Sequence, residues 1–223
     1  MFNKLLTFLF LFVFISSIRG NSGYEKYKIL SMNNQPSVVD FNQFAGFITV
    51  DYKNGRSLFF YFVEAEADPA SKPVFLWINN AGPGCSSYGT IFEKGPFRPT
   101  SEGGFVKNPH SWNQAANMLY LDAPAGFGFS YSNNTADYSL VLNDDFAARD
   151  NLVFLHHWFN EFSQYKSNDL YIGGEKNAAR LAANLAELIV KNNESFNRAS
   201  WWEILENLCI NFMDLELLKY IYV

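Results

Sequence analysis

The pattern of apolar and polar positions between residues 169 and 191 predicts a strand, a sharp turn and a helix in immediate succession. Leu170–Ile172 is a short apolar run typical of a strand, and Gly173–Glu175 is a tight break. The next apolar residues recur at the spacing of one helical face: Ala178, Leu181, Leu185 and Leu188. This is the setting of a nucleophile elbow, G-x-S-x-G, which lifts a serine above a sheet. In Gly174–Ala178 the serine position holds Lys176.

Upstream, apolar runs predict a hairpin. The runs Phe47–Tyr52 and Ser57–Ala65 flank Asn54-Gly55. Asn-Gly between two such runs is a strong hairpin signal, because a type I′ turn requires positive φ at both central positions. The sequence therefore predicts two antiparallel strands joined by a type I′ turn.

The following segments predict an α/β domain. Val74–Ile78 and Met118–Asp122 are continuous apolar runs, which are typical of strands buried on both faces. Each is followed by a Gly-rich loop, at residues 79–87 and 123–132, and open α/β sheets place their sites at such strand ends. Asn143–Phe162 predicts a helix, with acidic residues at its start. Strands alternating with helices indicate the α/β class.

Composition narrows the function classes. The 223 residues suit one domain, and 48% hydrophobic residues are enough for a core. A net charge of -5 without a basic block argues against a nucleic-acid partner. The sequence has no Cys/His cluster for a metal, and we predict no cofactor. Cys85 and Cys209 are the only cysteines, and they either pair or stay unpaired.

The N-terminus predicts a signal peptide. Met1–Gly20 has Lys4, then an apolar run shorter than the ~20 residues of a spanning helix, then small residues. We therefore expect a secreted or lysosomal/vacuolar protein with no stable membrane span, a domain over residues 21–198 and an apolar tail over residues 199–223. In such a protein, Asn133 and Asn193 begin sequons that predict glycosylation.

Taken in order, the motifs resemble the serine carboxypeptidase family, which has the α/β-hydrolase fold. The resemblance covers roughly residues 34–191. It rests on these segments: Phe44–Phe47, Phe60–Ala65, Gly82–Ser87, Phe92–Phe97, Asn108–Asn113, Ala123–Ser132 and Phe162–Ile172. It implies the N-terminal portion of an α/β-hydrolase sheet, with an antiparallel hairpin followed by parallel strands and helices. The family's C-terminal strands and cap segment are missing. The tail does not resemble the next family strand, and two interpretations stay open, a closing helix over the sheet or a misread exon.

The resemblance implies a reaction and a site. The family releases C-terminal residues from peptides by acyl transfer through a serine. It places the oxyanion-hole donors at Gly82 and Asn177, and a pocket for the substrate's terminal carboxylate at Asn80, Glu93 and Glu175. Peptide or protein C-termini are then the expected partners. Clustered acids of this kind favour binding at acidic pH, because a carboxyl group donates to a carboxylate only when protonated.

The chain departs from the family at the nucleophile. The family elbow reads G-E-S-Y-A-G, whereas residues 174–179 read G-E-K-N-A-A. The triad in this fold runs Ser, Asp, His along the chain, yet no histidine follows Lys176 and the only later Asp is Asp214. The chain's histidines are predicted to have surface or packing roles: His110, His156 and His157. No catalytic residue set is intact.

Three functional hypotheses follow. The chain is a catalytically inactive relative that binds peptide C-termini, or an incomplete product of a gene whose full-length form carries Asp and His, or a live enzyme with an unconventional nucleophile. The third requires water to expel the amine of Lys176 from a stable lysyl amide, which disfavours it chemically.

Overall fold

The computed structural model describes residues 23–32, 34–37, 39–79, 87–140, 143–175, 177–196 and 208–210. Side chains are not described for residues 87–90, 192–196 and 208–210. Several predictions fall outside the described residues: the signal segment Met1–Gly20, the loop residues Asn80, Gly82 and Cys85, and the nucleophile position Lys176. The side chains of Asn193 and Cys209 are likewise outside.

The described residues form a seven-stranded mixed sheet in the order β1-β2-β3-β7-β4-β8-β9. Its strands are β1 (Lys28–Ile29), β2 (Gln43–Asp51), β3 (Arg56–Val63), β4 (Val74–Asn79), β7 (Asn117–Asp122), β8 (Leu170–Gly174) and β9 (Leu208–Ile210). Strands β1 to β3 pair antiparallel, as do β3 and β7, whereas β7, β4, β8 and β9 run parallel. A separate antiparallel pair is made by β5 (Phe97–Pro99) and β6 (Phe105–Lys107).

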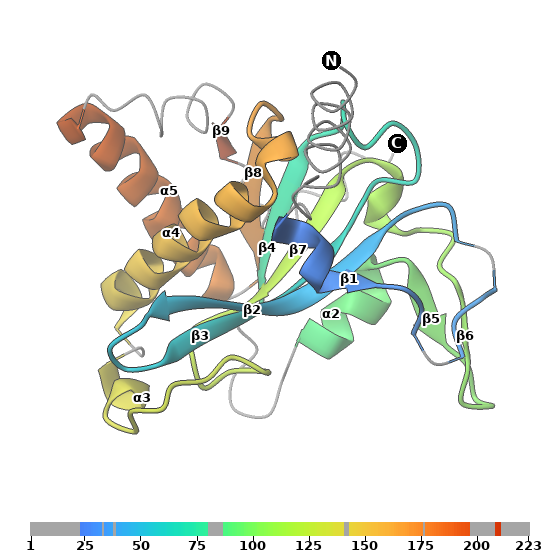
Figure 1. Ribbon diagram of the computed structural model, residues 1–223, viewed down its shortest axis with the longest axis horizontal. Helices are drawn as coiled ribbons and strands as arrows, with labels where there is room; N and C mark the ends of the chain where they lie inside the picture. The colour runs from blue at the N-terminus through green and yellow to red at the C-terminus, as the bar shows by residue number, and fades with distance from the viewer. Residues whose placement is uncertain are drawn as a thin grey trace, which may run out of the picture.

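Helices cover both faces of the sheet (Figure 1). The long helices α4 (Asp144–Glu161) and α5 (Asn177–Phe196) pack on one face, around a core that includes Phe60, Leu76 and Trp158. On the other face, α2 (Ser87–Lys94) and the β5-β6 pair cover a smaller core. The remaining short helices are η1 (Gly23–Tyr27), η2 (Trp112–Gln114), α3 (Asp137–Leu140) and η3 (Ser163–Tyr165).

The central strands confirm the apolar-run prediction. All six residues of β7 are buried, and β4 is buried except for Phe75. The helix α4 also matches its prediction, because Asn143 caps it by accepting from the backbone N–H groups of Asp145 and Phe146. Phe154, Leu155 and Trp158 on its inner face are fully buried.

The predicted hairpin is confirmed, but its type I′ turn is wrong. Asp51 pairs with Arg56 across the hairpin, so four residues form the loop rather than two. Gly55 has φ of 61°, whereas Asn54 is not among the residues with positive φ. The Asp51 carboxylate accepts hydrogen bonds from the backbone N–H groups of Lys53 and Asn54 and from the Asn54 amide, which stabilises the longer loop.

The tail also differs from the closing-helix interpretation. Residues 208–210 form β9, which pairs parallel with β8, so this part of the tail extends the sheet rather than closing over it as a helix. The free edge of β8 offers backbone N–H and C=O groups that a further strand can pair with. This pairing explains why residues 208–210 form a strand although the tail does not resemble the family's next strand.

Candidate active site

Three parallel strands end at one edge of the sheet. Asn79 of β4 lies opposite Asp122 of β7, and Ile78 of β4 lies opposite Gly174 of β8. The segments that leave these strands therefore start side by side, which is where open α/β sheets bind their ligands. Strands β7, β4 and β8 are neighbours in the sheet (Figure 1).

The strand–turn–helix at β8 and α5 has the tight geometry predicted for an elbow. A Cβ built on Gly174 would lie 2.8 Å from the backbone of Ala178, so only glycine fits where the helix begins. The Glu175 carbonyl accepts a hydrogen bond of 3.0 Å from the Ala178 N–H. Glu175 is half-buried and Asn177 is exposed at the first turn of α5. The turn thus presents Glu175 and Asn177 on either side of the nucleophile position.

Asn79 is a further candidate for the site, which the sequence analysis did not name. Its side chain is 6% exposed at the end of β4, and neither amide atom has a hydrogen-bond partner among the described residues. Counting back from Pro83 selects Asn80 instead, but this loop is one residue longer than the family's, so counting forward from the strand selects Asn79. The signal was present in the sequence as a polar residue at the end of a fully apolar strand.

Glu93 lies at the C-terminal end of α2. The buried amide of Asn108 donates to the carbonyl oxygens of Glu93 and Gly95, at 3.1 and 2.9 Å, and so fixes the chain there. A Cβ on Gly95 would meet the Ile91 carbonyl oxygen, so glycine is required at this turn. Two motifs of the sequence, at residues 92–97 and 108–113, are therefore one structural unit that places Glu93.

Lys94 is buried beside Glu93. The Lys94 ammonium lies 2.9 Å from the Glu93 carboxylate, and its side chain is 6% exposed whereas that of Glu93 is 68% exposed. The same ammonium lies 5.0 Å from the centre of the Trp77 ring and 5.6 Å from that of Trp112. The two indole rings meet edge to face at 5.3 Å, and they give the cation an aromatic surround.

The loop after β7 is held by Asp122. The Asp122 carboxylate accepts from the Phe129 N–H, and its carbonyl accepts from the Ser130 hydroxyl. Ser130 in turn accepts from the Phe59 N–H of β3. Gly128 has φ of 55°, and a Cβ there would strike the Asp122 carboxylate. The glycines of this loop thus allow it to fold back on the end of its own strand.

The three histidines sit in ordinary structural surroundings. His110 is exposed in the turn before η2. His156 and His157 lie on α4, where their rings meet at 5.6 Å, and His157 also meets the Tyr52 ring. Burial lowers the pKa of His156, with smaller contributions from His157 and Lys166. These ring contacts fit the packing roles predicted for the α4 pair.

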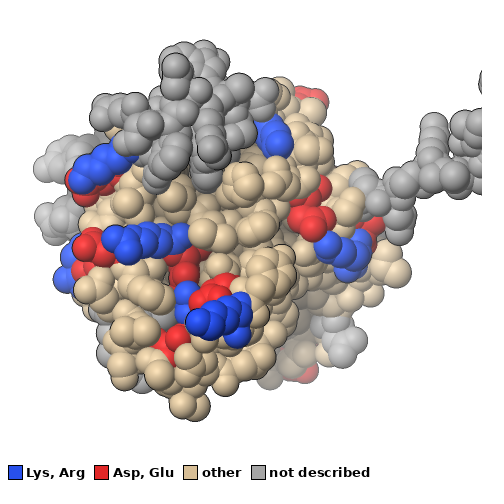
Figure 2. Space-filling model, turned by 60° about the vertical axis from the view of Figure 1, so that its left-hand side comes forward, with Lys and Arg blue, Asp and Glu red and all other residues tan. Residues whose placement is uncertain are grey.

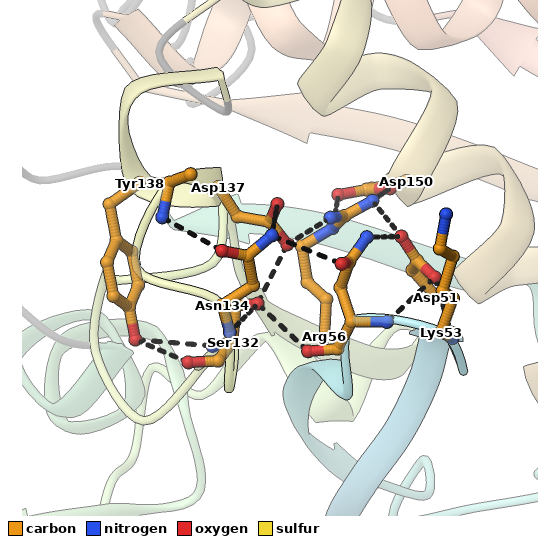
Figure 3. Close-up of polar contacts among 10 residues, drawn as sticks. Asp51, Lys53, Arg56, Ser132, Asn134, Asp137, Tyr138 and Asp150 are labelled. Carbon is orange, nitrogen blue, oxygen red and sulfur yellow. Dashed lines mark hydrogen bonds and ion pairs between the residues drawn. The ribbon is translucent and has the colours of Figure 1, made fainter.

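A buried charge cluster lies outside the predicted site (Figure 3). Arg56 donates through its Nε to Asp150 at 2.7 Å and through Nη1 to Asp137 at 2.5 Å, and it lies 3.3 Å from Asp51. Arg56, Asp137 and Asp150 have side chains only 3–8% exposed. The cluster ties the hairpin to α3 and α4. The sequence analysis missed it, because Arg56 and Asp150 are 94 positions apart and neither belongs to a recognisable motif.

The surroundings of Asp150 in this cluster raise its pKa. Burial is the main cause, Arg56 opposes it, and the charges of Asp51 and Asp137 add to it. A carboxyl whose pKa is raised on folding contributes stability below its unfolded pKa of about 3.9, and that contribution is lost as pH rises through the folded pKa. Asp51 shows the opposite shift, because its hydrogen bond from the Asn54 side chain lowers its pKa.

We expect Asp150→Asn to reveal this dependence. The free energy of unfolding of the unchanged protein, minus that of the variant, should fall as pH rises from about 4 into the neutral range, because only the unchanged protein has an Asp150 to ionise. Urea unfolding of both proteins at pH 4, 5, 6 and 7 measures the difference. Asp145→Asn, at an exposed position on α4, is the control. A difference that rises with pH would contradict the raised pKa.

Surface charge shows no large patch of one sign in the view of Figure 2, where basic side chains lie next to acidic ones. Ion pairs among the described residues include Lys26–Glu161, Lys107–Glu66 and Arg180–Asp144. Within the described residues, no helix is long and apolar enough to span a membrane, and no group of three His, Cys, Asp or Glu side chains is placed to hold a metal ion.

The architecture is that of the α/β-hydrolase class. Its overall arrangement matches a crystal structure of Kex1Δp, a prohormone-processing carboxypeptidase from Saccharomyces cerevisiae, with a TM-score of 0.67 and 24% identity over 84% of this chain and 42% of that one. This likeness concerns the fold alone.

Sequence comparison carries the assignment further. The serine carboxypeptidase family model matches residues 32–206, so the chain belongs to the serine carboxypeptidase family. It is 47% identical over 193 residues to serine carboxypeptidase-like 45 of Arabidopsis thaliana, which covers 85% of this chain and 41% of that protein. It is 45% identical over 181 residues to serine carboxypeptidase-like 26 of Oryza sativa subsp. japonica, covering 79% of this chain and 37% of that protein. The chain thus spans roughly two fifths of these relatives' length.

Proposed function

We propose that this chain is a peptidase-inactive member of the serine carboxypeptidase family that binds the free C-termini of peptides. The observation that carries the proposal is Lys176, which occupies the nucleophile position in an elbow whose strand, glycine turn and helix are kept. Acylation of Lys176 would give an amide. Hydrolysis of that amide would have to expel the lysine amine, which is a poor leaving group.

The proposed pocket lies at the carboxyl ends of β4 and β8. Glu175 comes directly after β8, and Asn79 and Asn80 end and follow β4, its parallel neighbour. Glu93 comes from the end of α2. Gly82 and Asn177 remain the proposed oxyanion donors, of which Asn177 opens α5. These groups offer hydrogen-bond donors for a carboxylate without any need for a nucleophile.

The proposal places the protein on the secretory route. Met1–Gly20 has the order of a signal peptide, and secretion or delivery to a lysosome or vacuole is the destination it supports. Asn133 is exposed in its loop, as is Thr135 of the same sequon, and this exposure supports Asn133 as a glycosylation site. Asn193 is the second proposed acceptor, within α5.

We expect peptides with a free C-terminus to bind at least about tenfold more tightly than the same peptides as C-terminal amides, because the pocket's hydrogen bonds to a charged group are lost with the amide. Isothermal titration calorimetry with the full chain at pH 5 measures the ratio. Asn79→Ala should reduce it towards one. The comparison with Asn80→Ala decides which of the two adjacent asparagines supplies the pocket amide.

The matched control is Glu187→Ala, at an exposed position on α5 where Glu187 pairs with Lys191. It should leave the ratio unchanged. Equal affinity for the acid and the amide in the unchanged protein would refute the carboxylate pocket.

A further inference from the structure

The two side chains of the Glu93–Lys94 pair differ in exposure to solvent, and this difference affects how a carboxylate ligand could bind. The Lys94 side chain is 6% exposed, and its ammonium lies against the rings of Trp77 and Trp112. The Glu93 side chain is 68% exposed. Lys94 is therefore the fixed half of the pair, and Glu93 is the half that water already solvates.

A buried ammonium requires an anion. Removing a charge from water without a partner costs several kcal/mol, roughly. Cation–π contacts with two indoles offset part of this cost but leave the N–H donors of the ammonium to be satisfied. Among the described residues, Glu93 is the carboxylate that pairs with Lys94. If Glu93 swings into water, the Lys94 ammonium is left ready for another carboxylate.

We propose that the Lys94 ammonium is the charge that receives the C-terminal carboxylate of a bound peptide, with Glu93 as its displaceable partner. The inference rests on the proposed pocket and changes its chemistry. The peptide carboxylate is bound by a fixed cation rather than by protonated carboxyl groups. Displacement is an exchange of one carboxylate for another at the buried ammonium, and the displaced Glu93, which is already 68% exposed, returns to water.

This chemistry changes the expected pH dependence. A pocket of protonated carboxyl groups weakens as pH rises from 5 to 7.5, because its donors are lost. Binding to the side chain of Lys94 needs no protonated carboxyl group. Binding through Lys94 is therefore retained at neutral pH.

Two single variants test the proposal with opposite expected signs. Lys94→Met keeps the apolar stem between the indoles and removes the charge, so affinity for a free-acid peptide should fall by about tenfold to a hundredfold. Glu93→Ala removes the competing anion, so affinity should rise several-fold. If Glu93 itself were the carboxylate donor, Glu93→Ala would weaken binding and Lys94→Met would leave it unchanged or tighten it.

The measurement is calorimetric titration of a dipeptide and its C-terminal amide at pH 5 and pH 7.5. Lys107→Met and Glu66→Ala are the matched controls, because they remove the two halves of another 2.9 Å lysine–glutamate pair. Both controls should bind as the unchanged protein does. The Glu93→Ala result alone decides the sign if Lys94→Met fails to fold, since Glu93 is exposed.

The outcomes separate this inference from the proposed function. An unchanged protein that does not distinguish acid from amide refutes the pocket and this inference together. An unchanged protein that prefers the acid, but loses the preference at pH 7.5 and is weakened by Glu93→Ala, keeps the pocket and overturns the role of Lys94. The role of Lys94 is supported if the protein still prefers the acid at pH 7.5, Lys94→Met weakens binding and Glu93→Ala strengthens it.

Discussion

Replacing Arg56 with methionine is expected to lower the free energy of unfolding by about 3–5 kcal/mol. Arg56 pairs with Asp137 and Asp150, whose side chains are 3% and 8% exposed, so the variant would leave two buried carboxylates without their cation. It would also remove the contact between the guanidinium and the Phe146 ring, at 4.7 Å. Urea unfolding followed by tryptophan fluorescence at pH 7 measures the change.

The control for Arg56→Met is Arg98→Met, which removes an exposed arginine from β5 and should change stability by less than about 0.5 kcal/mol. A second variant isolates the cause. Adding Asp137→Asn and Asp150→Asn to Arg56→Met should recover part of the loss, because the remaining buried groups are then neutral. A loss below about 1 kcal/mol for Arg56→Met would mean that the aspartates find other partners or become protonated at little cost.

Restoring serine at position 176 is not expected to create a peptidase. The elbow would regain its nucleophile, but the 223-residue chain has no histidine beyond that position to act as base. His156 and His157 lie on α4 and pack against each other. Loss of triad members typically lowers kcat by about 10⁴ to 10⁶, so Lys176→Ser should show turnover lower by that factor than a family member with a complete triad.

The assay for this prediction is hydrolysis of blocked dipeptides near pH 5, with an active serine carboxypeptidase as the positive control. Lys176→Ala, measured beside Lys176→Ser, reports any turnover that does not depend on residue 176. Turnover by the serine variant that approaches the positive control would show that another group supplies the base. Turnover by the unchanged chain that disappears in Lys176→Ala would instead make lysine a working nucleophile.

Only some residues of the predicted carboxylate pocket could be assigned by counting positions from a motif. The strand and the helix that flank Glu175 and Asn177 were predicted correctly, because the glycine break and the helical stripe are local patterns. The adjacent asparagines 79 and 80 could not be separated by counting, because the loop after β4 differs in length from the family pattern. Burial of the Asn79 amide at the strand end is a property of the folded sheet.

The hairpin turn and the tail show the same limit. Asn54-Gly55 correctly indicated the hairpin, yet the Asp51 carboxylate stabilises a four-residue loop instead of the two-residue turn. Residues 208–210 have no strong strand pattern of their own, and they become a strand by pairing with the edge of β8. In both cases a neighbouring group overrode the local preference.

The sequence by itself determined the hairpin of β2 and β3, the strands β4, β7 and β8, the helices α4 and α5, and the family that its motifs indicated. These features follow from periodicity, turn residues and spacing, which are properties of nearby positions. Only the tertiary structure decided which distant groups meet. It joined Arg56 to Asp137 and Asp150, and it enclosed the Lys94 ammonium between Trp77 and Trp112. Such contacts depend on how the layers pack, which no local pattern encodes.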